Sequence, residues 1–223
     1  MVKVDSDLSQ RWWSERESSN AREAPSSRNH HIGMPQNSAF FYGTLMHPKI
    51  LKRVIGNDGS HLRICPAVLL KFTRHKVKFA DYPGIIPYSQ GQALFDSEPD
   101  RETCSVRGTM VTGLSQSDIA LLDIFEGSEY TRDKVPVYPL SELVNLADYT
   151  MSTATPAPLP SDEELTEPVE VETYVYADIS CLMRDIWSFD NFLTQSAWKW
   201  YGSGSRNNPD YTEVDRRQAA GSK

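Results

Sequence analysis

Glu126 is the residue of this chain whose type and spacing point most directly to chemistry. Leu122 and Ile119 precede it by four and seven residues, so a helix would project its carboxylate between two apolar side chains, toward the core. Gly127 follows at once, as at a helix end, where backbone carbonyls disfavour negative charge. Burial and the dipole would both raise the pKa of the carboxyl, which suits a general acid/base near neutral pH. A solvated helix-end glutamate also fits the pattern, and Glu129 is expected to be the more solvated of the two.

A loop near residue 43 is the second feature that could take part in chemistry. Glycine lets a ligand approach the backbone closely, and the start of the following helix presents unpaired N–H groups, which together can hold a small anion such as a carboxylate. A purely structural turn between a strand and a helix is the alternative. The residues of this loop are Tyr42, Gly43, Thr44, Leu45, Met46 and His47.

The other reactive side chains form no pattern typical of a metal site or of covalent catalysis. The histidines have no i, i+4 pair and no ligand-type spacing to Cys or Asp: His30, His31, His47, His61 and His75. The cysteines are far apart and odd in number, which argues against a closed disulfide framework: Cys65, Cys104 and Cys181. No Ser or Cys lies in a Gly-x-Ser-x-Gly turn. We therefore predict no metal site and no covalent nucleophile.

Amino-acid composition indicates a globular protein with more acidic than basic residues. The 223 residues are 39% apolar and 24% charged, which is typical of one globular domain with appendages. The 23 Lys and Arg against 30 Asp and Glu give a net charge of -7, so nucleic acid and anionic membranes are improbable partners. There is neither an apolar leader nor a run of about 18 apolar residues, so we expect a cytoplasmic protein.

The folded unit is expected to span residues 39–202. Residues 1–38 are polar and charged apart from Trp12 and Trp13, and residues 203–223 lack periodicity, so both read as disordered tails. Within the unit, an acidic, proline-rich insertion is expected over about 147–168.

Periodicity predicts short strands and few helices, which favours an α+β fold. Ser115 and Asp118 have the spacing of a cap for the helix that ends at Glu126, and Ser188 is a candidate cap for the last helix. The expected strands are 39–42, 66–72, 74–79, 106–111, 135–137 and 169–176; the other expected helices run from Pro48 to Gly56 and over 179–186 and 192–197; residues 81–87 are expected to form a loop.

Three short motifs, in order, resemble the γ-glutamylcyclotransferase superfamily, and specifically its avirulence-induced-gene-like branch from plants and fungi. They are Phe41 to Met46, Tyr82 to Pro87, and Leu122 to Arg132. The likeness covers about residues 39–140, and more loosely 172–202. It implies a small mixed β-barrel flanked by helices.

The resemblance also implies a reaction and its residues. The Tyr42 to His47 loop would grip the glutamyl end of the substrate, and Glu126 would be the acid/base, with Glu129 and Tyr130 its nearest competitors. The loop that contains Tyr82, Pro83, Gly84 and Ile85 would lie near the leaving group. The substrate's own α-amine would attack its γ-amide carbonyl, so that 5-oxoproline forms and an amine leaves, without a cofactor.

Several functions remain open at this point. The substrate could be glutathione, a glutathione adduct met in fungal secondary metabolism, or a γ-glutamyl amino acid. The alternatives are a γ-glutamylamine cyclotransferase and a non-catalytic member that binds ligands or partners. The oligomeric state is not indicated by any motif.

Overall fold

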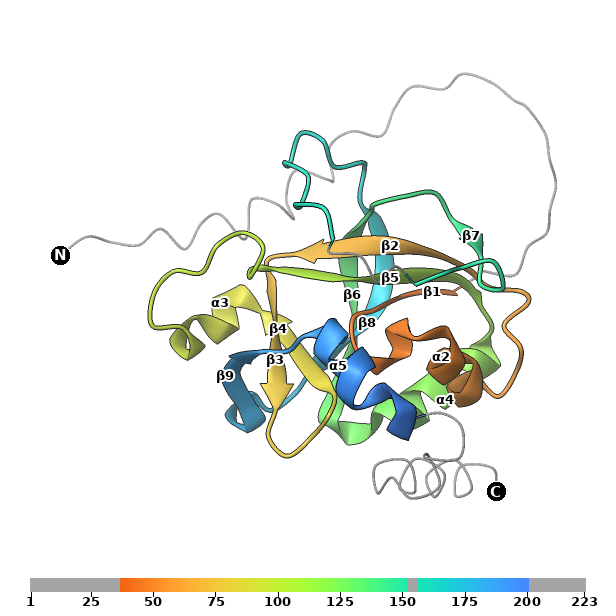
Figure 1. The fold of residues 1–223 in the computed structure, drawn as a ribbon, viewed down its shortest axis with the longest axis horizontal. Coiled ribbons are helices and arrows are strands. Elements are labelled where there is room, and N and C mark those ends of the chain that lie inside the picture. The colour runs from red at the N-terminus through yellow and green to blue at the C-terminus, as the bar shows by residue number, and fades with distance from the viewer. Residues whose placement is uncertain (1–36, 152–155, 201–223) are drawn as a thin grey trace, which may run out of the picture. The chain divides into compact units, whose positions relative to one another are not determined.

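The computed structural model describes residues 37–151 and 156–200 (Figure 1). The predicted tails, 1–38 and 203–223, therefore lie outside the described residues apart from Asn37 and Ser38, and so does the Trp12–Trp13 pair. Within the described part of the chain, no helix is long and apolar enough to cross a lipid bilayer.

Five strands close into a small barrel, as the resemblance implies. They are β1 (Asn37–Phe41), β2 (Arg63–Leu70), β5 (Ser105–Leu114), β6 (Tyr130–Pro139) and β8 (Val169–Tyr176). Their order is β5-β1-β8-β6-β2, and pairing between β2 and β5 completes the ring. The β1–β8 pair is parallel and the others are antiparallel, so the barrel is mixed. The α+β prediction is confirmed, and closure leaves these strands without the exposed edges that favour aggregation.

The barrel is filled by alternating inward side chains and by a close backbone approach at Gly108. A Cβ at Gly108 would lie 2.3 Å from the Phe41 carbonyl oxygen, so only glycine fits where β5 passes β1. The interior cluster comprises Phe40, Tyr42, Cys65, Ala67, Leu69, Ile85, Val106, Met110, Val135, Val137 and Val171. The short strand β7 (Val144–Asn145) pairs with the start of β2.

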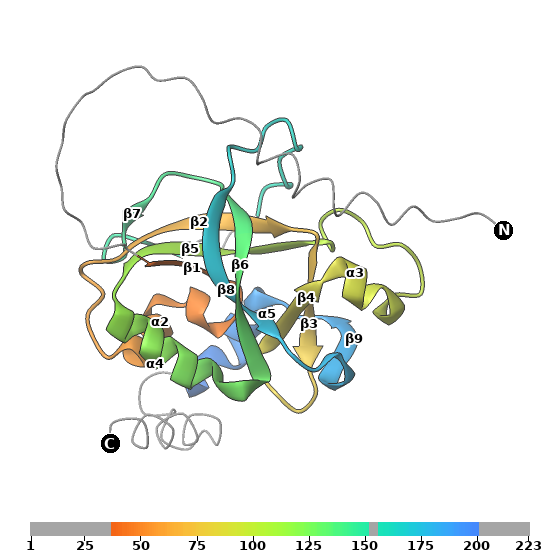
Figure 2. The same ribbon diagram turned by 180° about the vertical axis from the view of Figure 1, so that it is seen from behind.

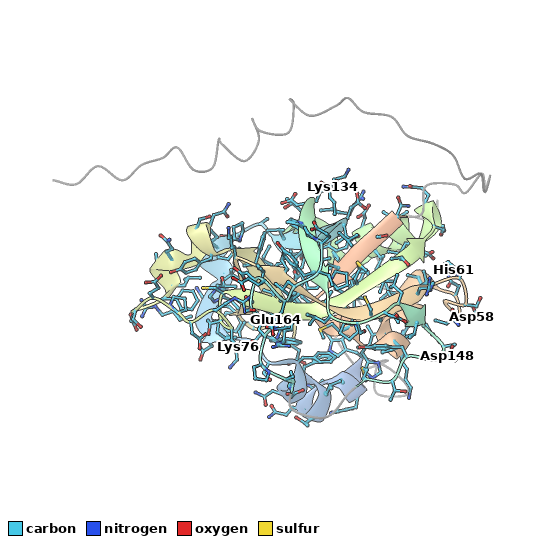
Figure 3. The ribbon with its side chains drawn as sticks, turned by 90° about the horizontal axis from the view of Figure 1, so that it is seen from above. Asp58, His61, Lys76, Lys134, Asp148 and Glu164 are labelled. Atoms are coloured by element: carbon cyan, nitrogen blue, oxygen red, sulfur yellow. The ribbon has the colours of Figure 1, made fainter. Side chains whose placement is uncertain are left out.

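A second sheet, ordered β4-β3-β9, continues from the barrel. Lys71, at φ +62°, forms the corner between β2 and β3 (Phe72–Val77). The predicted loop over 81–87 is wrong for its larger part, because β4 (Pro83–Pro87) is a strand. Both prolines are tolerated because β4 is an edge strand, where a missing N–H costs little. The positions of Lys76 on β3 and of Lys134 on β6 can be followed in Figure 3.

The predicted helix over 179–186 is also wrong. Its residues form a 3-10 turn, η4 (Ile179–Cys181), followed by the strand β9 (Leu182–Ile186). In this strand only Leu182 is buried, so the apolar residues at helical spacing make no buried stripe. The free edge of β3 pairs with β9 instead, which brings Val77 opposite Leu182.

Helices cover one side of the barrel, where α2, α4 and α5 gather in both ribbon views (Figures 1 and 2). Helix α2 (Pro48–Ile55) begins with the predicted proline and ends at Gly56 in the left-handed conformation. Helix α5 (Phe189–Gln195) is capped by Ser188, as predicted. The shorter elements are α3 (Tyr88–Gly91), η1 (Thr44–Met46), η2 (Gln92–Leu94), η3 (Gly127–Glu129) and η5 (Ala197–Lys199).

Helix α4 (Gln116–Glu126) has the predicted start and end. Ser115 and Asp118 form a reciprocal capping box, which satisfies N–H groups that the first turn cannot pair internally. At the other end Gly127 has φ +66°, a conformation that side chains with a Cβ rarely adopt.

The described residues of the acidic insertion, 147–151 and 156–168, form no helix or strand. Contacts with the loop before β5 attach this segment: the Leu159 amide donates to Glu102, and Asp162 pairs with Arg101. Its exposed residue Glu164 is labelled in Figure 3.

Candidate functional site

A cavity of about 210 Å³ lies between the end of β1 and the end of α4. Aromatic side chains supply most of its wall, and two carboxyl groups supply its acidity. The lining residues are Phe40, Phe41, Tyr42, Gly43, Thr44, Leu45, Tyr82, Pro83, Phe125, Glu126, Glu129, Tyr130, Tyr174 and Trp200. Such an enclosure excludes water from part of a small ligand and strengthens the electrostatic interactions inside it.

The floor of the cavity is the loop that leaves β1. Tyr42 anchors it, because its hydroxyl donates a hydrogen bond to the Tyr174 carbonyl on β8. Gly43 then passes directly beneath Pro83, where a Cβ would approach the Pro83 ring to 2.9 Å. A side chain at position 43 would therefore force the loop and β4 apart.

Three successive amides of this loop are available to a ligand. Within the described part of the chain, the N–H groups of Gly43, Thr44 and Leu45 make no hydrogen bond. The next two amides are used internally, since Met46 N–H donates to the Gly43 carbonyl and His47 N–H to the Thr44 carbonyl. Backbone donors grouped in this way form a site for a carboxylate or another small anion.

Two members of the predicted binding loop are not brought to the cavity. Neither Met46 nor His47 is among its lining residues in the described chain. The His47 ring instead accepts a hydrogen bond from the Lys49 amide through Nδ1, at 3.2 Å, and so caps α2. Burial and the nearby Lys49 charge lower the pKa of His47, which keeps the ring neutral and able to accept that bond.

Glu126 projects into the cavity from the last turn of α4, as its spacing predicts. Leu122 and Ile119 lie buried on the same helix face. The carboxyl group makes no hydrogen bond to any described residue. Burial, together with the charges of Glu129 and Asp123, raises its pKa from the ordinary value of 4.5 to about 8. Glu126 therefore holds its proton at neutral pH and can release it at little cost.

The neighbouring carboxylate of Asp123 is held differently. It accepts a hydrogen bond from the Tyr174 hydroxyl at 2.8 Å and pairs with Arg132 Nε at 3.0 Å. Arg132 also bridges to Glu172 on β8. Asp123 therefore has a hydrogen-bond donor and a cation beside it, whereas the environment of Glu126 favours the neutral acid.

Glu129 departs from the expectation of a solvated side chain. It is partly buried, lines the cavity, and its charge acts on Glu126. Tyr130, the next residue, also lines the cavity, and its hydroxyl donates to the Pro83 carbonyl at 2.8 Å. Burial raises the pKa of the Tyr130 hydroxyl well above its usual value, so it stays protonated as a donor.

Only part of the second motif, Tyr82 to Pro87, faces the cavity, because most of it forms the strand β4. Tyr82 and Pro83 face the cavity, whereas Gly84 and Ile85 do not. Gly84 packs under Tyr176, where a Cβ would approach the ring to 2.7 Å, and Ile85 is fully buried in the barrel interior. The expected ligand contact of Gly84 and Ile85 is therefore replaced by a packing role.

Several residues of the cavity wall are not among those predicted from the sequence. Phe40, Phe41 and Phe125 adjoin the predicted motifs and could have been included on that ground. Tyr174 and Trp200 come from distant parts of the chain and carried no local signal. Among the described residues, no group of three or more His, Cys, Asp or Glu side chains could hold a metal ion.

Comparison with known proteins gives a family match. A family model described as gamma-glutamyl cyclotransferase, AIG2-like, matches residues 39–188. Protein AIG2 C from Arabidopsis thaliana is 24% identical over 164 residues, which cover 73% of this chain and 76% of that protein. AIG2-like protein C from the same plant is 30% identical over 98 residues, or 44% of this chain and 48% of that protein.

The solved structures similar to this chain include a solution structure of an Arabidopsis thaliana protein, with a TM-score of 0.46 and 22% identity over 89% of this chain and 88% of that one. A second is a yeast gamma-glutamyl cyclotransferase specific to glutathione, with a TM-score of 0.43 and 13% identity over 83% of this chain and 96% of that one.

Proposed function

Because this chain belongs to the gamma-glutamyl cyclotransferase, AIG2-like family, we propose that it cleaves γ-glutamyl amides into 5-oxoproline and a free amine. The observation that carries the proposal is Glu126, a carboxyl group with a pKa of about 8 in the same cavity as three unpaired backbone amides. The Glu126 carboxyl can exchange a proton near neutral pH, and the three backbone N–H groups can hold a carboxylate.

The glutamyl end of the substrate would be bound by its α-carboxylate. The N–H groups of Gly43, Thr44 and Leu45 are donors of the right kind, and no described side chain competes for them. The aromatic walls would hold the glutamyl chain folded back, so that its α-nitrogen lies near its own γ-carbonyl carbon. Holding two reacting groups together in this way removes several kcal/mol from the barrier.

The chemistry needs one proton carrier. The α-ammonium of the substrate gives a proton to the Glu126 carboxylate, and the freed amine attacks the γ-carbonyl carbon. In the tetrahedral intermediate the leaving nitrogen takes that proton back from Glu126. The second proton of the attacking nitrogen passes by way of the same carboxylate to the departing amine, which leaves as an ammonium ion while the ring nitrogen keeps one proton. Because the pKa of Glu126 is raised to about 8, it lies much closer to that of an α-ammonium group than the pKa of an ordinary glutamate does, so the proton transfer costs less. The γ-amide bond breaks, a ring amide forms, and no redox step occurs.

A γ-glutamylamine substrate is the second candidate, and the charge of the cavity favours it. None of the described lining residues is Lys, Arg or His, whereas Glu126 and Glu129 are acidic. A leaving group with its own carboxylate, such as that of glutathione or a γ-glutamyl amino acid, would meet no counter-charge there. The acidic side chains would repel such a carboxylate, but they would not repel a neutral or cationic amine.

A non-catalytic role in ligand binding is the alternative from another class. It would require an anion-binding loop but no proton carrier. Glu126 speaks against it, because burying a carboxyl without a hydrogen-bond partner is costly and needs a function to maintain it.

The test compares the wild-type chain with Glu126→Gln and with Glu142→Gln, the same change at an exposed glutamate. Purified proteins are incubated with glutathione, γ-glutamyl dipeptides, a glutathione S-adduct and γ-glutamyl-lysine, and 5-oxoproline is quantified. We expect release by the wild type and by Glu142→Gln, and a loss of at least about a hundredfold in Glu126→Gln. Equal turnover by Glu126→Gln would refute its role, and no release by any protein would favour the binding alternative.

A further inference from the structure

Arg74 on β3 is a cation that the proposed chemistry does not use, and it lies directly behind the anion-binding loop. Its Nη1 donates to the Tyr42 carbonyl at 2.7 Å and to the Arg107 carbonyl at 3.0 Å. The guanidinium carbon lies 5.2 Å from the centre of the Trp187 ring. Its Nε is buried and has no hydrogen-bond partner in the described chain.

The guanidinium also lacks a carboxylate partner among the described residues. Asp190, on the exposed first turn of α5, is the carboxylate whose charge acts on Arg74, and the two form no ion pair. Burial lowers the pKa of Arg74 to about 10, so the group keeps its charge at neutral pH. A cation that is largely removed from water and has no carboxylate in direct contact is costly, and its positive potential extends into the surroundings.

One peptide unit connects Arg74 to the cavity. The Tyr42 carbonyl, which accepts from Arg74, belongs to the same peptide as the Gly43 N–H. No described peptide bond is cis, and in a trans peptide the C=O and N–H point in opposite directions. The Gly43 N–H therefore points away from Arg74, and Gly43 itself lines the cavity. A charged donor on the carbonyl polarises the peptide and makes its N–H a stronger donor.

We infer that Arg74 is a positioning residue for substrate recognition, which acts through the Tyr42–Gly43 peptide to strengthen the hold of the loop on the substrate's α-carboxylate. This inference rests on the proposed function. Arg74 does not line the cavity, so it does not contact the substrate. It fixes the peptide and supplies the positive charge that the cavity wall itself lacks in the described residues.

A purely structural role is the competing explanation, because Arg74 also joins two carbonyls from different strands. The two explanations differ in one measurable quantity. That quantity is the preference for a substrate with an α-carboxylate over one without it. If Arg74 acts electrostatically, replacing it lowers this preference, whereas loss of structure lowers the turnover of both substrates alike.

The test uses γ-L-glutamyl-n-butylamide and its α-carboxamide analogue, which differ only in the charge at the α-carbon. The ratio of their kcat/KM values is measured for the wild type, Arg74→Gln and Arg74→Lys. We expect Arg74→Gln to lower the preference for the carboxylate about tenfold, mainly through KM. Arg74→Lys keeps the charge and should retain most of the preference. An unchanged ratio in a folded Arg74→Gln protein would overturn the inference.

Asp190→Asn provides a second variant that does not disturb the barrel, because Asp190 is exposed. Removing this opposing charge should raise the preference for the carboxylate about twofold. If Arg74→Gln does not fold, an unchanged or lowered ratio in Asp190→Asn overturns the inference.

Failure of the proposed function has a different signature. If the wild type releases neither 5-oxoproline nor its amide from the two probes, the catalytic proposal is wrong. Calorimetric binding of the same two compounds then tests Arg74, because the preference for the carboxylate should still fall in Arg74→Gln. Binding without any preference in the wild type overturns the inference.

Discussion

The most specific prediction concerns the stability of the protein rather than its activity: Glu126→Gln should make the fold more stable at alkaline pH. The pKa of Glu126 is about 8 in the folded chain, against an ordinary value of 4.5. Between these two values the folded state holds a proton that the unfolded state has lost. The free energy of unfolding therefore falls as the pH rises from 4.5 to 8, and it levels off above 8.

The size of the effect follows from the displacement of the pKa. A displacement from 4.5 to about 8 corresponds to roughly 5 kcal/mol of lost stability once the pH is well above 8. At pH 5 the corresponding loss is less than about 1 kcal/mol, because the pH is then only half a unit above the pKa of the unfolded state. Glutamine has nearly the same shape and cannot ionise, so the substituted chain avoids the loss.

The assay is urea unfolding of the wild type and of Glu126→Gln at pH 5 and pH 9. Subtracting one protein from the other cancels every titrating group that the two share. We expect similar stability at pH 5, an advantage of about 4 kcal/mol for Glu126→Gln at pH 9, and equal m-values. Glu142→Gln serves as the control, because its exposed side chain should give no pH-dependent difference. If Glu126→Gln and the wild type lose stability in parallel from pH 5 to pH 9, Glu126 is not desolvated and the reasoning about its chemistry fails.

Three further outcomes are expected. The kcat/KM of the wild type should rise about tenfold per pH unit below pH 8, because only the carboxylate form of Glu126 accepts a proton; a rate that is flat from pH 6 to 8 would contradict this. Gly43→Ala should raise KM about tenfold or more while the chain stays folded by circular dichroism, since the added Cβ would lie 2.9 Å from Pro83 and displace the loop; unchanged KM would show that the loop does not bind the substrate. Asp118→Ala should lower the free energy of unfolding by about 2–4 kcal/mol, because the buried carboxylate accepts hydrogen bonds from Ser115 and Asn57 and pairs with His61. It should leave KM unchanged, since the cap lies about 12 Å along α4 from Glu126; a large change in KM at unchanged stability would contradict that separation.

Helix α4 shows which features the sequence alone could predict. Its start depends on Ser115 and Asp118, and its end on Gly127, all of which are local signals. The direction of Glu126 follows from helix periodicity, so its burial was predictable without knowledge of the partners. The five barrel strands were expected at nearly the right places for a similar reason, since alternation of side chains is also local.

The predictions that are wrong concern features that depend on pairing between distant segments. Strand β9 forms because the edge of β3 is open to it, and no pattern within residues 182–186 reports that edge. Strand β4 looked like a loop because its prolines are acceptable only at a sheet edge, which is a property of the assembled sheet. The same limit hid Tyr174 and Trp200 from the predicted cavity.

Arg74 shows a further limit. In the sequence it is one basic residue in a strand, and a solvated arginine is the ordinary expectation for such a residue. Its position behind the Tyr42–Gly43 peptide exists only because β3 turns away from the barrel at Lys71.

The hydrogen bond from Tyr42 to the Tyr174 carbonyl has a consequence for how the protein is made. It joins two residues that are 132 positions apart, and the parallel β1–β8 pair spans almost the same interval. Contacts of such long sequence separation form late and slow the folding of a domain. On the ribosome, the loop that begins at Gly43 would therefore wait for β8 to emerge before it acquired its final shape. Nascent chains that stop before β8 should bind no ligand, even though Glu126 and the whole loop have already been synthesised.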